Sequence, residues 1–293
     1  MISYLMASSL PPDFFGRIGF IFKNYGLSMA KGAGTTLLIA IVGTLIGCII
    51  GFIVGLIQTI PVNPNDSIAK KILLKIVNII LKIYVEVFRG TPMMVQAMFL
   101  HYGAMLILNL HMDMWTSAFF IVSINTGAYM AETVRGGIFS VPLSQTEGAK
   151  AIGMNHVQTM VNVILPQALR NIMPQIGNNL IINIKDTCVL SCIGVVELFF
   201  TSKSVAGTYY TYFETFTITM VMYLIMTLFF SWLLRFFEKR MDGPAEYDLA
   251  TTDTLAFTSG TLTDPRKDFV DDRKLSDVPG GRSAEDNMNN TRR

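Results

Sequence analysis

Long apolar stretches alternate with short polar ones over most of the chain. The hydrocarbon core of a bilayer is about 30 Å thick and requires roughly 20 apolar residues in a helix that rises 1.5 Å per residue. Five stretches approach that length, so the pattern predicts an all-α membrane protein with about five transmembrane helices. The predicted spans are approximately residues 34–58, 92–110, 115–134, 176–200 and 216–237.

The two ends of the chain differ from this central region. Phe14, Ile18 and Ile21 recur on one helical face, which predicts an N-terminal amphipathic helix, within residues 1–32, that lies along the membrane interface. Residues 243–293 carry many charged and few large apolar side chains, which favours a disordered cytoplasmic tail because little surface can be buried there. We assign the region between them, residues 33–240, to one transmembrane domain.

Positive charges in the short connections indicate the orientation in the membrane, since cytoplasmic connections are enriched in Lys and Arg. An odd number of spans with these connections inside predicts an N-terminus outside the cell and a C-terminus in the cytoplasm. Arg17, Lys23 and Lys31 oppose this assignment. The residues that support it are Lys70, Lys71, Lys75, Arg135, Lys150, Arg170, Arg235, Lys239 and Arg240.

Composition narrows the possible functions. The chain is 51% apolar and 15% charged, with a net charge of +2 and no block of like charges that would attract nucleic acid. It contains no phosphate-binding loop of the form G-x-x-x-x-G-K-[ST] and no cluster of His and Cys at metal-ligand spacing. No nucleophile and base stand at a plausible spacing either. We therefore expect a non-catalytic chain without a cofactor or metal of its own.

A polar stretch after the third predicted span contains a helix start signal. Ser144 and Glu147 follow Pro142 in an S-x-x-E pattern, which predicts a capping box in which Ser144 caps a helix over residues 145–152. Gly153 is suited to end that helix because glycine adopts a positive φ at low cost.

A second start signal follows at once. Asn155 and Gln158 predict another capped helix that runs to Pro166. On these signals alone, the stretch fits a structural hairpin in a loop as well as a functional element.

Two stripes mark the predicted spans. Gly43, Gly47, Gly51 and Gly55 are spaced by four residues, which predicts close packing against another helix.

A polar stripe on the fourth span consists of Asn179, Asn183, Asp186 and Thr187. Charged groups inside a membrane are costly unless they pair or face water, so this stripe is a candidate for contact with a zwitterionic substrate. The alternative is structural: Lys185 and Asp186 would then lie near a membrane edge or pair with Glu132 or Arg89.

The segment that contains Glu147, Gly148, Ala149 and Gly153, followed after nine residues by residues 163–166 (VILP), resembles the EAA motif of binding-protein-dependent ABC importer permeases. Gly148 replaces the usual Ala, and Val163 the usual Ile. The resemblance implies the type I ABC importer permease fold. It also implies that residues 145–152 form the cytoplasmic coupling helix and that the contacts to the ATPase come from Glu147, Gly148, Ala149, Ile152 and Gly153.

Three further segments resemble the polar amino acid branch of that family: residues 86–92 (EVFRGTP), residues 125–138 (NTGAYMAE and RGGI) and residues 185–198 (KDTCVLSCIGVVEL). Cys188 stands where a Ser is more usual. Thr91 and Glu132 join the candidate substrate pathway from these segments.

The resemblance implies a permease subunit for polar amino acid import in a bacterial cell membrane. Its implied partners are ABC ATPase subunits that bind ATP and Mg, a second permease copy or homologue, an extracellular or periplasmic solute-binding protein, and membrane lipid. A gradient-driven secondary transporter or channel, with Glu132 and Asp186 as ion sites, is the alternative.

Overall fold

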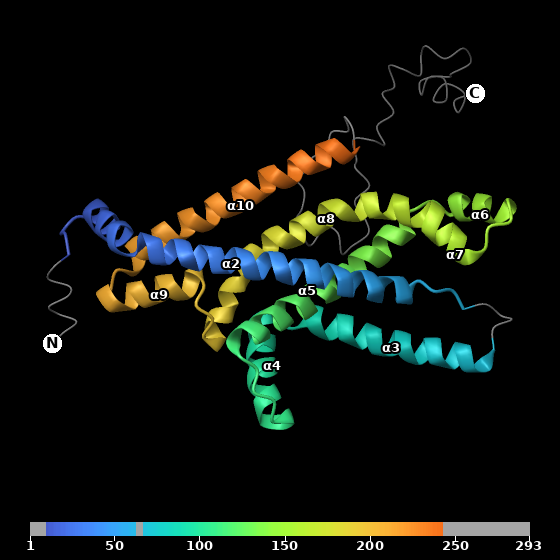
Figure 1. The fold of residues 1–293 in the computed structure, drawn as a ribbon, viewed down its shortest axis with the longest axis horizontal. Helices are drawn as coiled ribbons and strands as arrows, with labels where there is room; N and C mark the ends of the chain where they lie inside the picture. Colours follow the sequence, from blue (N-terminus) through green and yellow to red (C-terminus); the bar gives the residue numbers. More distant parts are fainter. Residues whose placement is uncertain (1–9, 63–66, 243–293) are drawn as a thin grey trace, which may run out of the picture. The chain divides into compact units, whose positions relative to one another are not determined.

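The computed structural model describes residues 10–62 and 67–242, so the predicted tail over residues 243–293 lies outside the described residues. Within the described ranges the chain is helical, and the all-α fold is confirmed (Figure 1). The elements are α2 (Phe14–Gln58), α3 (Ile68–Gly90), α4 (Met93–Leu108), α5 (Met114–Phe139), α6 (Leu143–Ala151), α7 (His156–Thr159), the π-helix η1 (Met160–Ile164), α8 (Leu165–Asp186), the 3₁₀ helix η2 (Thr187–Ile193), α9 (Leu198–Tyr209) and α10 (Tyr212–Asp242).

Helix α2 is much longer than a bilayer core. Its 45 residues correspond to roughly 67 Å at 1.5 Å per residue. The amphipathic segment 14–25 and the predicted span 34–58 therefore belong to one helix, with no break at residue 32. Figure 1 shows the first turns of α2, in dark blue, inclined to the rest of the helix. The interfacial position of these turns stays a prediction.

The glycine strip of α2 packs against α5, as its spacing predicts. A Cβ added at Gly47 would lie 2.6 Å from the Cβ of Thr126, and one at Gly55 would lie 2.8 Å from the Cβ of Val134. Only glycine allows the two backbones to approach this closely. The contacts pair Gly43 with Val122, Gly47 with Thr126, Gly51 with Met130 and Gly55 with Val134.

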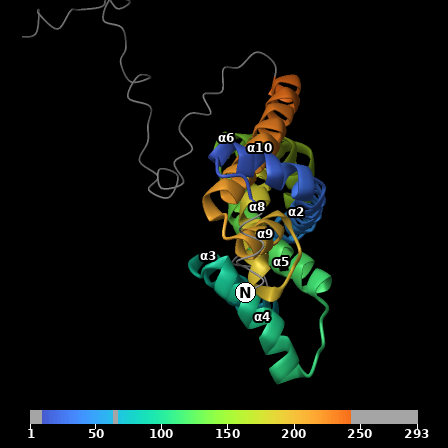
Figure 2. The ribbon, with the colours of Figure 1, turned by 90° about the vertical axis from the view of Figure 1, so that its left-hand side faces the viewer.

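The remaining helices pack around α2 and α5. Side chains of α2 contribute to each of four apolar clusters, and α5 contributes to three of them. Helix α3 contacts the pair through Val85, which packs near Val54 and Ala131. Helix α4 contacts α5 and η2 near its start, and Figures 1 and 2 both show it directed away from α2 and α10.

The fourth predicted span, residues 176–200, is wrong as a single helix. The chain is helical from His156 to Ile193, turns at Gly194, whose φ is +87°, and continues as α9 at an angle of 56°. Glycine has no Cβ that would clash in this left-handed conformation, which is why the turn occurs there. The bend is typical of a broken span or of a re-entrant loop.

Length and composition identify fewer spans than the hydropathy pattern predicts. Among the described residues, α2 and residues 212–237 of α10 are long and apolar enough to cross a membrane, and the broken pair would add a third. Helix α4 is apolar but shorter over Met93–Ile107. The total of five spans stays a prediction.

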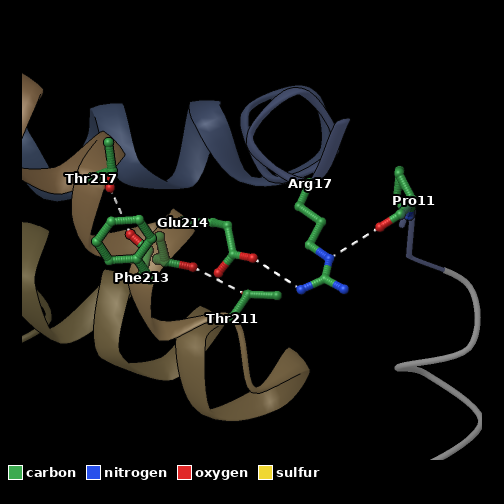
Figure 3. A network of polar contacts seen from close by, with 7 residues as sticks. Pro11, Arg17, Thr211, Phe213, Glu214 and Thr217 are labelled. Carbon is green, nitrogen blue, oxygen red and sulfur yellow. Dashed lines mark hydrogen bonds and ion pairs between the residues drawn. The ribbon is translucent and has the colours of Figure 1, made fainter. Parts of the chain in front are cut away.

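The beginning of α2 is bonded to the beginning of α10 (Figure 3). The guanidinium of Arg17 donates to the carboxylate of Glu214 over 3.1 Å and to the carbonyl of Pro11 over 3.0 Å. Phe14 and Phe213 pack beside this pair with ring centroids 5.4 Å apart. The positive charge of Arg17, which opposes the predicted orientation, is therefore partly compensated within the chain.

Helix α5 begins at a capped position in the connection after α4. The carboxylate of Asp113 accepts hydrogen bonds from the amides of Trp115 and Thr116 and from the Thr116 hydroxyl. The bond from the Thr116 hydroxyl lowers the pKa of Asp113 below its usual value because it favours the charged form.

The glycine contact generates a stability prediction. Gly47→Val should lower the free energy of unfolding by about 1–3 kcal/mol or more, because overpacking forces α2 away from Thr126. Thermal unfolding of the purified chain in detergent measures the effect. Gly34→Val is the matched control, since nothing lies within 4 Å of a Cβ added at Gly34. Equal stability of the two variants would contradict the packing role.

Candidate functional site

Helix α6 begins earlier than the capping signal predicts. Its first residue is Leu143, Pro142 occupies the N-cap position, and no side chain caps the helix. The predicted capping box of Ser144 and Glu147 is therefore wrong. The helix includes Leu143, so Ser144 lies within its first turn. The Pro142 carbonyl accepts from the amide of Gln145 over 3.0 Å.

The end of α6 agrees with the prediction. Gly153 has a φ of +85°. Its amide donates to the carbonyl of Lys150 over 2.9 Å, and the next amide, of Met154, donates to the carbonyl of Ala149 over 3.0 Å. These two bonds form a Schellman motif, which satisfies carbonyls that the helix leaves open.

Helix α7 begins with the predicted capping box. The Asn155 side chain accepts from the amide of Gln158, and the Gln158 side chain accepts from the amide of Asn155, each over 2.9 Å. One residue therefore separates the turn at Gly153 from the cap of the next helix. Such a short, doubly capped connection fixes the angle between α6 and α7.

The second helix was predicted to end at Pro166, and this prediction is wrong. It passes through the π-helix η1 and continues as α8 to Asp186. In an α-helix, Pro166 could donate no bond to the carbonyl four residues earlier, and its ring would collide with that carbonyl. The wider π-turn, in which the Leu165 amide bonds to the Met160 carbonyl, ends immediately before this proline.

The hairpin of α6 and α7 is exposed over most of its surface, and only Ala149 and Thr159 are buried. Glu147, Gly148, Ile152 and Gly153 all face outward. The hairpin also carries three exposed apolar side chains, which we call the hairpin apolar residues. They are Leu143, Ile152 and Val157, which are 71%, 79% and 67% exposed.

The amides of the polar stripe on α8 bind neighbouring helices. The Asn183 amide donates to the hydroxyl of Thr44 on α2 over 2.7 Å and to that of Thr126 on α5 over 2.9 Å. The Asn179 amide lies 3.3 Å from the sulfur of Met130 and 3.0 Å from the Gln175 carbonyl. Both side chains are buried, so they hold α8 against α2 and α5.

The other two members of the stripe lie in different surroundings. Asp186 is exposed at the end of α8, whereas Thr187 is fully buried and donates to the carbonyl of Ile184 over 3.1 Å. The four predicted residues thus do not present one common polar surface.

Glu132 lies beside two arginines. Its carboxylate pairs with Arg89 at the end of α3 and lies 3.9 Å from Arg135, one turn further along α5. The Arg89 guanidinium is also 5.6 Å from the ring centre of Tyr129. Neither Lys185 nor Asp186 forms an ion pair with Glu132 or Arg89 among the residues that the structure describes. The other form of the structural alternative, in which Lys185 and Asp186 lie near a membrane edge, stays a prediction.

A buried amide network near Thr91 was missed by sequence reasoning. The Gln96 side chain donates to the carbonyls of Phe88 and Thr91 and to the Thr91 hydroxyl, each over 2.8 Å. The Asn125 amide donates to the Gln96 side-chain oxygen over 2.9 Å. Thr91 itself is exposed. The network binds open carbonyls at the end of α3 and fixes the turn into α4 beside α5.

The chain matches known proteins over most of its helices. Residues 67–243 match the family model of the binding-protein-dependent transport system inner membrane component. The glutamine transport system permease protein GlnP of Escherichia coli (strain K12) is 39% identical over 167 residues, which cover 57% of this chain and 76% of that protein. The probable amino-acid permease protein YxeN of Bacillus subtilis (strain 168) is 34% identical over 165 residues, 56% of this chain and 74% of that protein.

Solved structures share the fold. A chain of an amino acid ABC transporter crystallised with histidines is 32% identical, with a TM-score of 0.68, and the match covers 79% of this chain and all of that one. A chain of the inward-facing methionine ABC transporter MetNI is 19% identical, with a TM-score of 0.54 over 71% of this chain and 94% of that one.

The two glycines of the hairpin should respond in opposite directions to alanine. Gly148→Ala should stabilise α6 by about 1 kcal/mol, because Gly148 lies inside the helix and nothing surrounds its Cβ position. Gly153→Ala should destabilise α6 by about 1 kcal/mol, because alanine is strained at a φ of +85°. Hydrogen exchange of the α6 amides measures both, and the same sign for both variants would refute the assigned helix end.

Proposed function

Because the chain belongs to the family of inner membrane components of binding-protein-dependent transport systems, we propose that it is the permease of an ATP-driven importer of polar amino acids. Its relatives include permease proteins of glutamine and amino acid transport systems. ATP and Mg are bound by a partner ATPase, and α6 is the coupling helix that contacts it.

The exposure of the hairpin apolar residues is the observation that carries the coupling role. Each of these three large side chains leaves apolar surface in water on a short, rigid hairpin, which favours a protein partner over solvent. Glu147 and Lys150 of α6 are also exposed. Apolar contacts surrounded by charged groups are typical of a specific protein interface.

The connection from the hairpin to the membrane helices supports the same role. Helical structure runs from His156 through η1 and α8 to Ile193 without interruption. Ala168 and Ile172 of α8 pack in one buried cluster with Val134 and Ile138 of α5. A displacement of α6 would therefore reach α8 and α5 through helix and packed side chains.

The hydrogen bonds of α8 reduce the number of residues that we propose for direct contact with the substrate. Asn179 and Asn183 act indirectly, since their amides bind Met130 of α5 and Thr44 of α2 and hold α8 in place. Asp186 and Thr91 have exposed side chains and remain our candidates for direct contact with the substrate. Thr187 and Glu132 support the pathway through their contacts with Ile184 and Arg89.

We extend the proposal to the assembly and its orientation. The permease would act with a second copy or homologue, two ATPase subunits and an external solute-binding protein in a bacterial inner membrane. The Lys and Arg distribution supports an N-terminus outside and a C-terminus in the cytoplasm.

A gradient-driven transporter is less well supported. That mechanism uses Glu132 and Asp186 as ion or proton sites. The Glu132 carboxylate is paired with Arg89, and Asp186 is exposed at the end of α8.

Coupling is tested with Ile152→Asp in liposomes that contain the permease, its co-expressed ATPase and the external binding protein. A charge at Ile152 should lower substrate-stimulated ATP hydrolysis roughly tenfold, as expected for a hot-spot residue that is buried at an interface. Uptake of glutamine and other polar amino acids should fall in parallel.

Leu110→Asp is the matched control. Leu110 is exposed in the α4–α5 connection, which we predict to face outside, so hydrolysis should stay near the wild-type rate. Full stimulation in Ile152→Asp, or uptake that persists without the ATPase, would refute the proposal.

A further inference from the structure

The bend at Gly194 starts a new helix whose first backbone amides need hydrogen-bond acceptors. A new helix, α9, begins at Leu198 only a few residues after the turn at Gly194. The first amides of any helix have no partner within that helix, and an unsatisfied amide at membrane depth costs several kcal/mol. The amides of Leu198, Phe199 and Phe200 therefore need acceptors from elsewhere in the chain.

Glu197 supplies two of these acceptors. Its carboxylate accepts from the Phe199 amide over 2.7 Å and from the Phe200 amide over 2.6 Å. The side chain has no exposed surface. A carboxylate at this point also lies at the positive end of the α9 dipole, which favours the charged form.

Helix α2 supplies the third acceptor at the point where its backbone lies close to the start of α9. The Leu198 amide donates to the Thr36 hydroxyl oxygen over 3.3 Å, and this hydroxyl donates to the Glu197 carboxylate over 3.4 Å. Gly32, one turn earlier on α2, makes the approach possible. A Cβ at Gly32 would lie 3.0 Å from the Glu197 carbonyl oxygen and from the Leu198 backbone.

Helix α10 completes the site from the other direction. The Tyr223 hydroxyl donates to the Glu197 carboxylate over 3.1 Å. One turn before it, the Thr219 hydroxyl donates to that of Ser202 on α9 over 2.7 Å. The polar atoms of Glu197 thus bind three elements: α9, α2 and α10.

We propose that Glu197 is a positioning residue for transport, which fixes α9, the helix that follows the bend at Gly194, to α2 and α10. Without this carboxylate, two amides of α9 would lose their acceptor and the link to Tyr223 and Thr36 would be lost at the same point. Helix α9 would then separate from its neighbours while the α2–α5–α8 core stays folded. The effect on transport rests on the proposed function, whereas the effect on α9 does not.

The position of α9 is measured by the rate at which a membrane-permeant maleimide labels Ala206→Cys. Ala206 is fully buried on α9, so the thiol reacts only when α9 opens. The native cysteines are first replaced by Cys48→Ala, Cys188→Ser and Cys192→Ser. Glu197→Ala should raise the labelling rate by roughly tenfold or more, because hydrogen bonds to a charged group are lost.

Tyr223→Phe is the second variant, since it removes one hydroxyl and keeps the helix cap. It should raise labelling less than Glu197→Ala. Thr217→Val is the matched control, because the Thr217 hydroxyl on α10 bonds, within residues 10–62 and 67–242, only to the Phe213 carbonyl of its own helix. Its labelling rate should equal that of the wild type.

Ala128→Cys on α5 separates a local effect from general unfolding, because Ala128 is equally buried. Labelling that rises at position 206 and not at 128, together with slower ATP-driven uptake by the Tyr223→Phe complex, supports the proposal. An unchanged rate at 206, an equal rise at both positions, or wild-type uptake despite faster labelling would overturn it. If the wild-type complex itself shows no ATP-driven uptake, the proposed function fails and the labelling result stands.

Discussion

The close contact between α2 and α5 depends on glycines of α2, which carry no side chain. Glycine at every fourth position lets the two backbones meet, and α5 fills the resulting groove with Val122, Thr126, Met130 and Val134. The other helices rely on this contact. Asn183 of α8 bonds to one hydroxyl from each helix, so its site exists only while the two helices touch. Val85 of α3 packs where both helices meet. A lipid bilayer provides no hydrophobic drive between helices, which is why close packing has this central role.

Three buried polar side chains lie at irregular points of the helices, where a regular helix stops or where three helices converge. Gln96 binds the open carbonyls at the end of α3. Asn183 joins three helices, and Glu197 binds the open amides at the start of α9. In a membrane, no water is available to form hydrogen bonds with these groups instead. The polar residues therefore mark the irregular points of the fold, and Asp186 and Thr91 stand out because they are exposed.

Sequence reasoning succeeded where the signal was local. The helix end at Gly153 and the capping box of Asn155 and Gln158 depend on residues within a single turn. It failed at Ser144, because an S-x-x-E pattern does not distinguish a helix that Ser144 caps, and that begins at residue 145, from one that begins two residues earlier at Leu143. The glycine strip predicted close packing but not its partner, and the roles of Asn179 and Asn183 stayed open. Those answers lie in residues such as Thr44, which is 139 positions away from Asn183.

The π-turn before Pro166 also sets the rotation of α8 about its own axis. An α-helix advances about 100° per residue, and a turn closed by five residues instead of four accommodates one residue more than the regular spiral. If the same residues formed a regular α-helix instead of η1, the whole of α8 would turn by about that angle relative to α7. Asn183 would then point away from Thr44 and Thr126, and Ile172 away from Gly137. Five residues between the exposed hairpin and the membrane helices thus determine which side of α8 faces the centre of the fold.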